Sequence, residues 1–166
     1  MTAGIERIGS RAALLATSRV ALAACVVALL VASGRDSAAE AGPRATVAVE
    51  VTGLRSESGR VGVLLFDQAD GYPSEPARAL RKGWAPIRAG KAVVVFKALE
   101  FGTYAAFAFH DEDGNGVVRT NIIGMPTEGV GASNRAKGRM GPPRFKAASF
   151  EVASEQKVVP IVLRYL

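Results

Sequence analysis

"TVAVEVT", residues Thr46–Thr52, indicates the fold of this chain because its apolar residues alternate with polar ones. Val47, Val49 and Val51 fall on one face of an extended strand, and threonine and glutamate fall on the other. A period of two residues is typical of a strand that is buried on one face only. The stretch therefore predicts one strand of a sheet that packs against a core.

Further strands follow, and most are separated by turns. Apolar or alternating runs predict strands over Arg60–Phe66, Lys91–Lys97, Thr103–His110, Ala147–Val152 and Val158–Leu166. Pro160 favours an edge position or a strand start in the last of these, because proline has no N–H for the ladder. Between the second and third strands, Ser74 is predicted to cap a short helix over Glu75–Lys82 that stops at Gly83.

Short strands joined by turns predict an all-β fold, an antiparallel β-sandwich with one short helix. In "LEFGTYAAFAF", Gly102 and Tyr104 come at the start of a strand. A tyrosine at such a corner can donate its hydroxyl hydrogen to upstream backbone, as in the tyrosine corner of Greek-key sandwiches. The alternative is that Tyr104 is an ordinary strand aromatic.

The N-terminal part of the chain has the layout of a secretory signal peptide. Three arginines precede the uncharged run Val20–Gly34, and small residues follow it. Cleavage is expected after Ala39 or Ala41. We therefore expect a leader over residues 1–39 and a single domain over residues 40–166, exported to the periplasm or the extracellular space.

Two other readings of the leader stay open. The apolar run is shorter than the roughly 20 residues that a spanning helix needs, so an uncleaved anchor is the less favoured alternative. "LAAC", ending at Cys25, has the form of a lipoprotein cleavage site, but the apolar run continues beyond this cysteine and Arg19 interrupts it before. Cleavage at Ala39 removes the only cysteine of the chain, which leaves the mature domain without a disulfide.

The charge of the predicted mature part is mildly basic, with 17 Lys+Arg and 13 Asp+Glu from Glu40 onward. The basic residues are scattered, and no aromatic residues are interleaved with them to stack on bases. Scattered charge is typical of a solvated surface. We therefore do not expect nucleic-acid binding.

An acidic loop after the strand Thr103–His110 resembles the first half of a calcium loop. Asp111, Asp113 and Asn115 alternate and a glycine follows, so their oxygens can converge, with the Val117 carbonyl as a further ligand. The sequence thus names calcium as the candidate cofactor.

The motif then departs from the calcium pattern. Arg119 occupies the ninth position, where an oxygen ligand is needed, and Ile122 the twelfth, where an EF-hand has glutamate. Glu128 can complete a shell only if the chain folds back. The alternative is an acidic turn whose Asp and Asn side chains bond their own backbone.

His110 is the only histidine of the chain and precedes Asp111. A general base or a metal ligand is one interpretation, and a hydrogen-bonded structural histidine is the other. No nucleophile stands out, because Ser133 lacks a Gly-x-Ser-x-Gly context. We assign no catalytic residue, and the candidate binding residues are His110, Glu128, Ser133 and Asn134.

The segment Ile123–Pro143 is rich in glycine and proline, which predicts a long loop without a regular element. Ile123, Met125 and Val130 suggest that the loop packs down rather than staying free. Together with the acidic turn it is expected to form a surface feature at one end of the sandwich.

Three stretches, "FGTYAAFAFHDEDGNG", "NIIGMPTEGVGASN" and "PPRFKAASFEV", resemble a bacterial exported family known as a domain of unknown function, family 2141. The resemblance implies an immunoglobulin-like or transthyretin-like sandwich and carries no assigned activity. The positions that match its motif are His110, Asp111, Asn115, Gly116, Asn121, Gly124, Pro126, Glu128, Gly129, Ser133 and Asn134. Arg119 stands where family members typically have an acid, which weakens the calcium prediction. Its guanidinium could instead neutralise Asp111 or Asp113 directly.

Two functional classes follow from these observations. The favoured one is an exported, non-enzymatic binding or structural module whose partner is a protein or small molecule, with membrane contact only through an uncleaved leader or an acylated Cys25. The alternative is a small exported enzyme that uses His110, Asp111 and Glu128 as acid/base groups. That reading requires a concave pocket that holds all three side chains.

Overall fold

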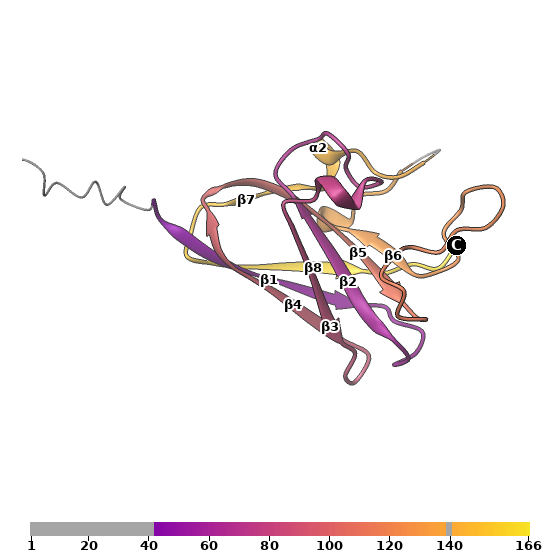
Figure 1. Cartoon of the computed structure of the whole chain (residues 1–166). Helices are drawn as coiled ribbons and strands as arrows, with labels where there is room; N and C mark the ends of the chain where they lie inside the picture. The colour runs from indigo at the N-terminus through magenta and orange to yellow at the C-terminus, as the bar shows by residue number, and fades with distance from the viewer. Residues whose placement is uncertain (1–41, 139–140) are drawn as a thin grey trace, which may run out of the picture. The chain divides into compact units, whose positions relative to one another are not determined.

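The computed structural model describes residues 42–138 and 141–166, and in this part of the chain two β-sheets pack face to face (Figure 1). The predicted leader, with Cys25 and both cleavage positions, lies outside the described residues. The strands are β1 (Arg44–Thr52), β2 (Arg60–Phe66), β3 (Arg81–Pro86), β4 (Ala92–Glu100), β5 (Gly102–Asp111), β6 (Val130–Ala132), β7 (Ser149–Val152) and β8 (Gln156–Val162). Short helical turns lie at η1 (Pro76–Arg78), η2 (Ser133–Arg135) and α2 (Phe145–Ala148). The all-β sandwich is confirmed.

The first sheet has the strand order β4-β1-β8. The valines of β1 point inward as the alternation predicts, and Val49 lies opposite Val94 of β4 and Val159 of β8. β4 runs antiparallel to β1, but β8 runs parallel to it, so one strand pair departs from the antiparallel pattern. The edge position favoured by Pro160 is confirmed, because β8 ends this sheet.

The second sheet has the order β3-β2-β5-β6, and β7 also pairs with β5. Its two central strands, β2 and β5, are buried on both faces. One face meets the first sheet, and the other packs under the segments after β2 and before β7, where Tyr72 lies edge-on between Phe66 and Phe145. Because these strands are covered on both faces, their sequences are nearly continuous apolar runs without alternation.

The helix predicted over Glu75–Lys82 is wrong in extent. Only Pro76–Arg78 forms a helical turn, and the chain then enters β3, an edge strand that pairs with β2. A Cβ at Gly83 would lie 2.5 Å from Cγ1 of Val94, so this glycine permits close packing between the sheets and does not end a helix.

The expectation of no regular element over Ile123–Pro143 is also wrong in part. β6 pairs with Phe107–Phe109 of β5. A Cβ at Gly131 would lie 2.8 Å from Cγ2 of Ile161, and one at Gly129 2.6 Å from the Tyr165 ring. These glycines allow a short strand to approach its neighbours closely.

The tyrosine corner is confirmed, since the Tyr104 hydroxyl donates to the Glu100 carbonyl at 2.8 Å. This bond fixes the turn between β4 and β5 and sets the start of the strand that leads to the acidic loop. Within the described ranges, no helix is long and apolar enough to cross a membrane.

Candidate functional site: an acidic rim

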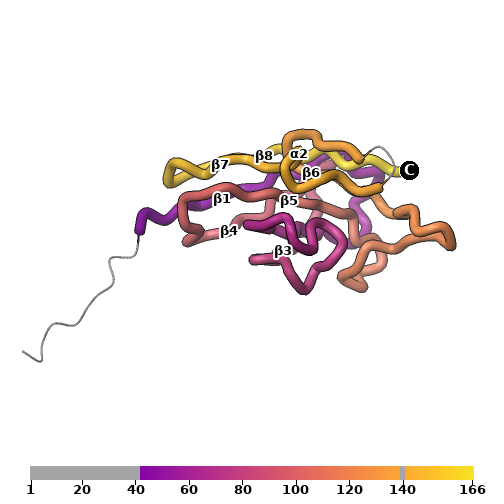
Figure 2. The backbone as a smooth tube through the Cα atoms, turned by 90° about the horizontal axis from the view of Figure 1, so that it is seen from above, coloured from indigo at the N-terminus to yellow at the C-terminus, as the bar shows by residue number. Residues whose placement is uncertain are grey.

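The predicted site residues gather where β5 ends and a long excursion of the chain begins. Figures 1 and 2 show this excursion, in orange, extending beyond the end of the sandwich at which the C-terminus also lies. His110 and Asp111 are the last two residues of β5, and both side chains are fully buried. We call the group formed by Asp111, Asp113 and Glu128 the acidic rim.

His110 is held by hydrogen bonds at both ring nitrogens. Nε2 lies 2.7 Å from the Ser58 carbonyl, which only accepts, so Nε2 carries a proton. Nδ1 lies 2.7 Å from the Tyr165 hydroxyl, and that same oxygen accepts from the backbone N–H of Arg55. This histidine therefore ties β5 to the turn before β2 and to the C-terminal segment.

Asp111 is buried, and only one of its oxygens is satisfied. Oδ2 accepts from Arg60 Nε at 2.8 Å and from the Gly116 N–H at 3.1 Å. Oδ1 is buried and has no hydrogen-bond partner among the described residues. A buried carboxylate oxygen without a partner is costly, and such an atom in a native fold calls for a water or an ion.

Glu128 returns from later in the chain to meet these residues. It is 1% exposed, its Oε1 accepts from the Glu112 N–H at 3.1 Å, and its Oε2 accepts from the Arg119 N–H at 2.9 Å. The chain thus folds back as a completed shell would require. Asp111, Asp113 and Glu128 each offer a ligand oxygen, and these atoms all lie within 4.8 Å of one another.

The two other predicted metal ligands, Asn115 and the Val117 carbonyl, belong to the same turn as Asp113. Asn115 bonds within the turn, because its Nδ2 donates to Asp113 Oδ2 at 2.9 Å and its Oδ1 accepts from the Val117 N–H at 2.8 Å. Val117 is exposed. The acidic turn is therefore stabilised by its own Asp and Asn side chains, as the alternative interpretation of the sequence expected. Two of its carboxylates, Asp111 and Asp113, also lie close to Glu128.

Arg119 pairs with Asp113 through its guanidinium. The hydrogen bond from Arg119 holds the pKa of Asp113 below its usual value, and the same bond raises the pKa of Arg119. This is the direct neutralisation suggested by the sequence. The pair is half-exposed, so a competing cation can reach Asp113 from solvent.

Arginine side chains pair with the carboxylates at and beside the acidic rim. Arg55 forms a two-pronged pair with Glu112, with N–O distances of 2.7 and 2.5 Å, and this holds the pKa of Glu112 below its usual value. With Arg60 on Asp111 and Arg119 on Asp113, three guanidiniums face four carboxylates. Counted with every acid ionised and His110 neutral, the group has a formal charge of minus one.

Sequence reasoning missed Arg55, Arg60 and Tyr165. The partners they contact lie 51 to 110 residues away along the chain, so no local pattern links them. The glycine at position 129 is the one local trace of Tyr165, because any Cβ there would lie 2.6 Å from its ring.

Ser133 and Asn134 do not contact the acidic rim. The buried Ser133 hydroxyl donates to the Ala148 carbonyl at 2.6 Å and accepts from the Ala106 N–H at 3.0 Å. Asn134 has a positive φ of 55° and donates from its amide to the Ser149 carbonyl. These two residues join η2 to β5 and to the start of β7.

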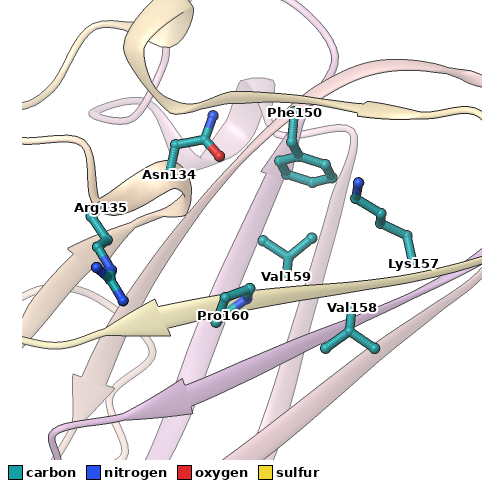
Figure 3. A pocket seen from close by; sticks show the side chains of 7 residues that line it. All are labelled: Asn134, Arg135, Phe150, Lys157, Val158, Val159 and Pro160. Carbon is teal, nitrogen blue, oxygen red and sulfur yellow. The ribbon is translucent and has the colours of Figure 1, made fainter.

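Asn134 also lies on an open hollow of about 450 Å³ between η2, β7 and β8. Figure 3 shows Arg135 and Lys157 toward opposite ends of it, with Phe150 and Val159 between them. Its lining residues are Asn134, Arg135, Phe150, Lys157, Val158, Val159 and Pro160. None of the proposed acid/base residues is among them.

Comparison with known proteins places the chain in a family. The family described as "Uncharacterized protein conserved in bacteria (DUF2141)" matches residues 49–160, a span that begins in β1 and ends in β8 and includes the whole acidic rim. No curated protein and no solved structure matches the chain. The chain therefore belongs to the DUF2141 family.

Proposed function

We propose that this DUF2141 protein is an exported, non-catalytic binding module of the bacterial cell envelope that takes up calcium at the acidic rim. Two facts about one residue carry the proposal: Asp111 Oδ1 is buried and lacks a partner among the described residues. Asp111 also belongs to a group that brings three carboxylates together. A bound cation would satisfy this oxygen and balance the net negative charge of the site.

Calcium fits the ligand chemistry better than magnesium does. All three side chains offer hard carboxylate oxygens, and they come from a turn and a returning loop, a flexible set that suits the irregular coordination of calcium. Magnesium demands a near-ideal octahedron and keeps several of its waters. The Val117 carbonyl is the further ligand that the sequence motif suggests.

The contacts favour binding over catalysis. His110 is fully buried with both ring nitrogens engaged, and both oxygens of Glu128 accept backbone N–H bonds. A general acid or base must reach its substrate directly or through one water. The alternative of an exported enzyme built on these residues draws no support from this arrangement.

Export rests on the leader pattern of the sequence. Mass spectrometry of the mature N-terminus tests it, with the expected first residue Glu40 or Gly42. A mature chain that begins at an acylated Cys25 would assign the lipoprotein alternative instead, and an intact leader would assign the anchor. The partner in the envelope is expected to be a protein or a small molecule.

Thermal unfolding with calcium and with chelator tests the cation site. Saturating calcium at about a hundred times its Kd is expected to stabilise the fold by about 2.7 kcal/mol, seen as a higher Tm. Asp111→Asn should abolish this shift, while the matched variant Asp67→Asn, on an exposed loop, should keep it. Equal Tm values of wild type in calcium and in chelator would overturn the proposal.

A further inference from the structure

The loop between Arg119 and Thr127 ends in an apolar tip. Ile122 and Ile123 are 104% and 77% exposed, and Met125 is 43% exposed. The prediction that Ile123 and Met125 pack down is therefore wrong. Single exposed apolar residues are ordinary, whereas neighbouring ones on one loop form a small apolar surface that a partner can cover. We call Ile122, Ile123 and Met125 the apolar tip.

The tip is held in shape by its own hydrogen bonds. Asn121 Oδ1 accepts from the N–H groups of Ile123 at 3.1 Å and Met125 at 2.9 Å, and the Asn121 N–H donates to the Met125 carbonyl at 2.8 Å. The Gly124 N–H donates to the Asn121 carbonyl. These bonds pair the backbone N–H groups of Ile123, Gly124 and Met125, which lowers the cost of moving this part of the loop out of water.

The base of the same loop is part of the acidic rim. The Arg119 N–H donates to Glu128, and its carbonyl accepts from the Thr127 N–H at 2.9 Å. Ile122 is three positions after Arg119, so the tip can reach at most about 10 Å beyond the rim. Side chains that enter a lipid interface typically bury to about 5–10 Å, so the reach is sufficient.

The charge of the rim depends on whether the cation site is filled. Four carboxylates face three guanidiniums, so a divalent cation would change the net charge from one negative to one positive. The side chains of Arg55, Arg60 and Arg119 are 51%, 41% and 56% exposed and lie around this site. A loaded rim therefore presents positive charge next to an apolar tip, which complements an anionic lipid surface.

We propose that the apolar tip docks the domain on an anionic bilayer when the acidic rim holds calcium, an inference that rests on the proposed function. A bilayer fits better than a protein partner because the tip is a narrow projection of three side chains. A specific protein interface buries about 800 Å² on each partner and needs a broader surface. This route to a membrane requires neither an uncleaved leader nor an acylated cysteine.

Co-sedimentation with lipid vesicles tests the inference. The exported protein, purified as the cell processes it, is mixed with phosphatidylglycerol/phosphatidylethanolamine or pure phosphatidylcholine vesicles in millimolar calcium or in chelator. We expect binding only to the anionic vesicles and only with calcium. The double variant Ile122→Ser, Ile123→Ser should partition about tenfold more weakly. Val158→Ser, at an exposed valine of β8, is the matched control and should bind as wild type.

The outcomes separate the two proposals. Suppose that calcium raises the Tm. The lipid inference then fails, and the cation site stands, if wild type does not bind anionic vesicles or if the double variant binds them as wild type does. The latter result would show that the apolar tip is not the lipid contact. Vesicle binding that persists in chelator would show that docking does not require calcium. A Tm that is the same with and without calcium would overturn the proposed function itself. The double variant should retain the calcium-dependent Tm shift, which shows that it folds.

Discussion

At the scale of single residues, the buried polar side chains at the end of β5 divide into structural and unsatisfied groups. His110 belongs to the first, because Tyr165 and Ser58 satisfy both of its nitrogens. Asp111 belongs to the second, because one of its oxygens lacks a partner among the described residues. The sequence placed these two residues side by side in one motif, but only their surroundings separate their roles.

Tyr165→Phe tests the structural role of His110. Loss of the hydroxyl leaves a buried ring nitrogen and the Arg55 N–H without their partner, at a cost of about 1–3 kcal/mol in the free energy of unfolding. Tyr72→Phe is the matched control, because that hydroxyl makes one long bond of 3.5 Å. Urea unfolding should show the larger loss for Tyr165→Phe, and equal losses would contradict this account of the network.

Arg119→Gln tests whether the guanidinium competes with the cation. The substitution releases Asp113 from its ion pair while it keeps the backbone N–H that Glu128 accepts. Calcium affinity measured by isothermal titration calorimetry should therefore rise by roughly a few-fold, because an exposed ion pair competes only weakly. An unchanged or weaker affinity would show that Asp113 is not a ligand or that Arg119 does not block it.

At the scale of secondary-structure elements, glycines set how closely neighbouring segments approach. Gly59 and Gly90 both have a φ of 70°, a backbone conformation that costs other residues about 1–2 kcal/mol. They differ in surroundings, because a Cβ at Gly59 would lie 2.1 Å from the Asp111 carbonyl oxygen, whereas one at Gly90 would meet nothing within 4 Å.

Gly59→Ala and Gly90→Ala form a matched pair. Both should lower the free energy of unfolding through the strained φ, and Gly59→Ala should lower it further because the turn must move away from Asp111. Chemical denaturation measures both. If the two variants lose the same free energy, close packing of the turn before β2 against Asp111 is contradicted.

The elements that the sequence predicts well are those with a clear apolar period. β1 shows the alternation of a strand buried on one face, and β4 and β5 are also evident from their composition. The sequence predicts the end of a helix where β3 begins, because this edge strand contains Gly83 and Pro86 and shows no alternation of apolar and polar residues. β6 was overlooked because glycine in a strand permits close packing but resembles a loop in sequence.

The site was predictable only as far as it is local. The turn motif identifies Asp111 and Asp113. Glu128 can join them only if the chain folds back, and the structure shows that it does. The arginines that pair with the acids come from separate loops and strands, so their charge balance needs the tertiary structure. The net charge at the rim therefore could not be derived from composition.

At the scale of the whole molecule, ion pairs at one end of the sandwich make stability depend on pH. The pKa of Glu112 lies below its ordinary value of 4.5 because Arg55 donates to it, and that of Asp113 lies below 3.8 because of Arg119. A carboxyl whose pKa is lower in the folded state stabilises the fold above its unfolded pKa. That stability is lost as the pH falls through the folded value.

The free energy of unfolding is therefore expected to decline as the pH drops below about 4.5. Arg55→Gln should flatten this decline, because Glu112 then titrates nearer to its ordinary value in the folded state. Arg88→Gln, at an exposed arginine remote from the acidic rim in sequence, is the control and should retain the wild-type slope. Identical slopes in all three proteins would show that the Arg55–Glu112 pair does not contribute to the pH dependence of the free energy of unfolding.

The two faces of the molecule also differ in how they are covered. The outer face of the second sheet lies under the segments around Tyr72 and Phe145, whereas the first sheet leaves Val93, Val95 and Val158 about half exposed. The covered sheet is the one whose central strand leads into the acidic rim. Packing on both sides of β5 fixes the position of Asp111 from which the proposed site is built.

A crystal structure grown in millimolar calcium tests most directly whether the free oxygen of Asp111 is a cation ligand. We predict an ion about 2.3–2.6 Å from Asp111 Oδ1, with Asp113 and Glu128 in the same shell and Arg119 turned away from Asp113. A water bonded to Oδ1, with the Arg119–Asp113 pair intact, would contradict the proposed site.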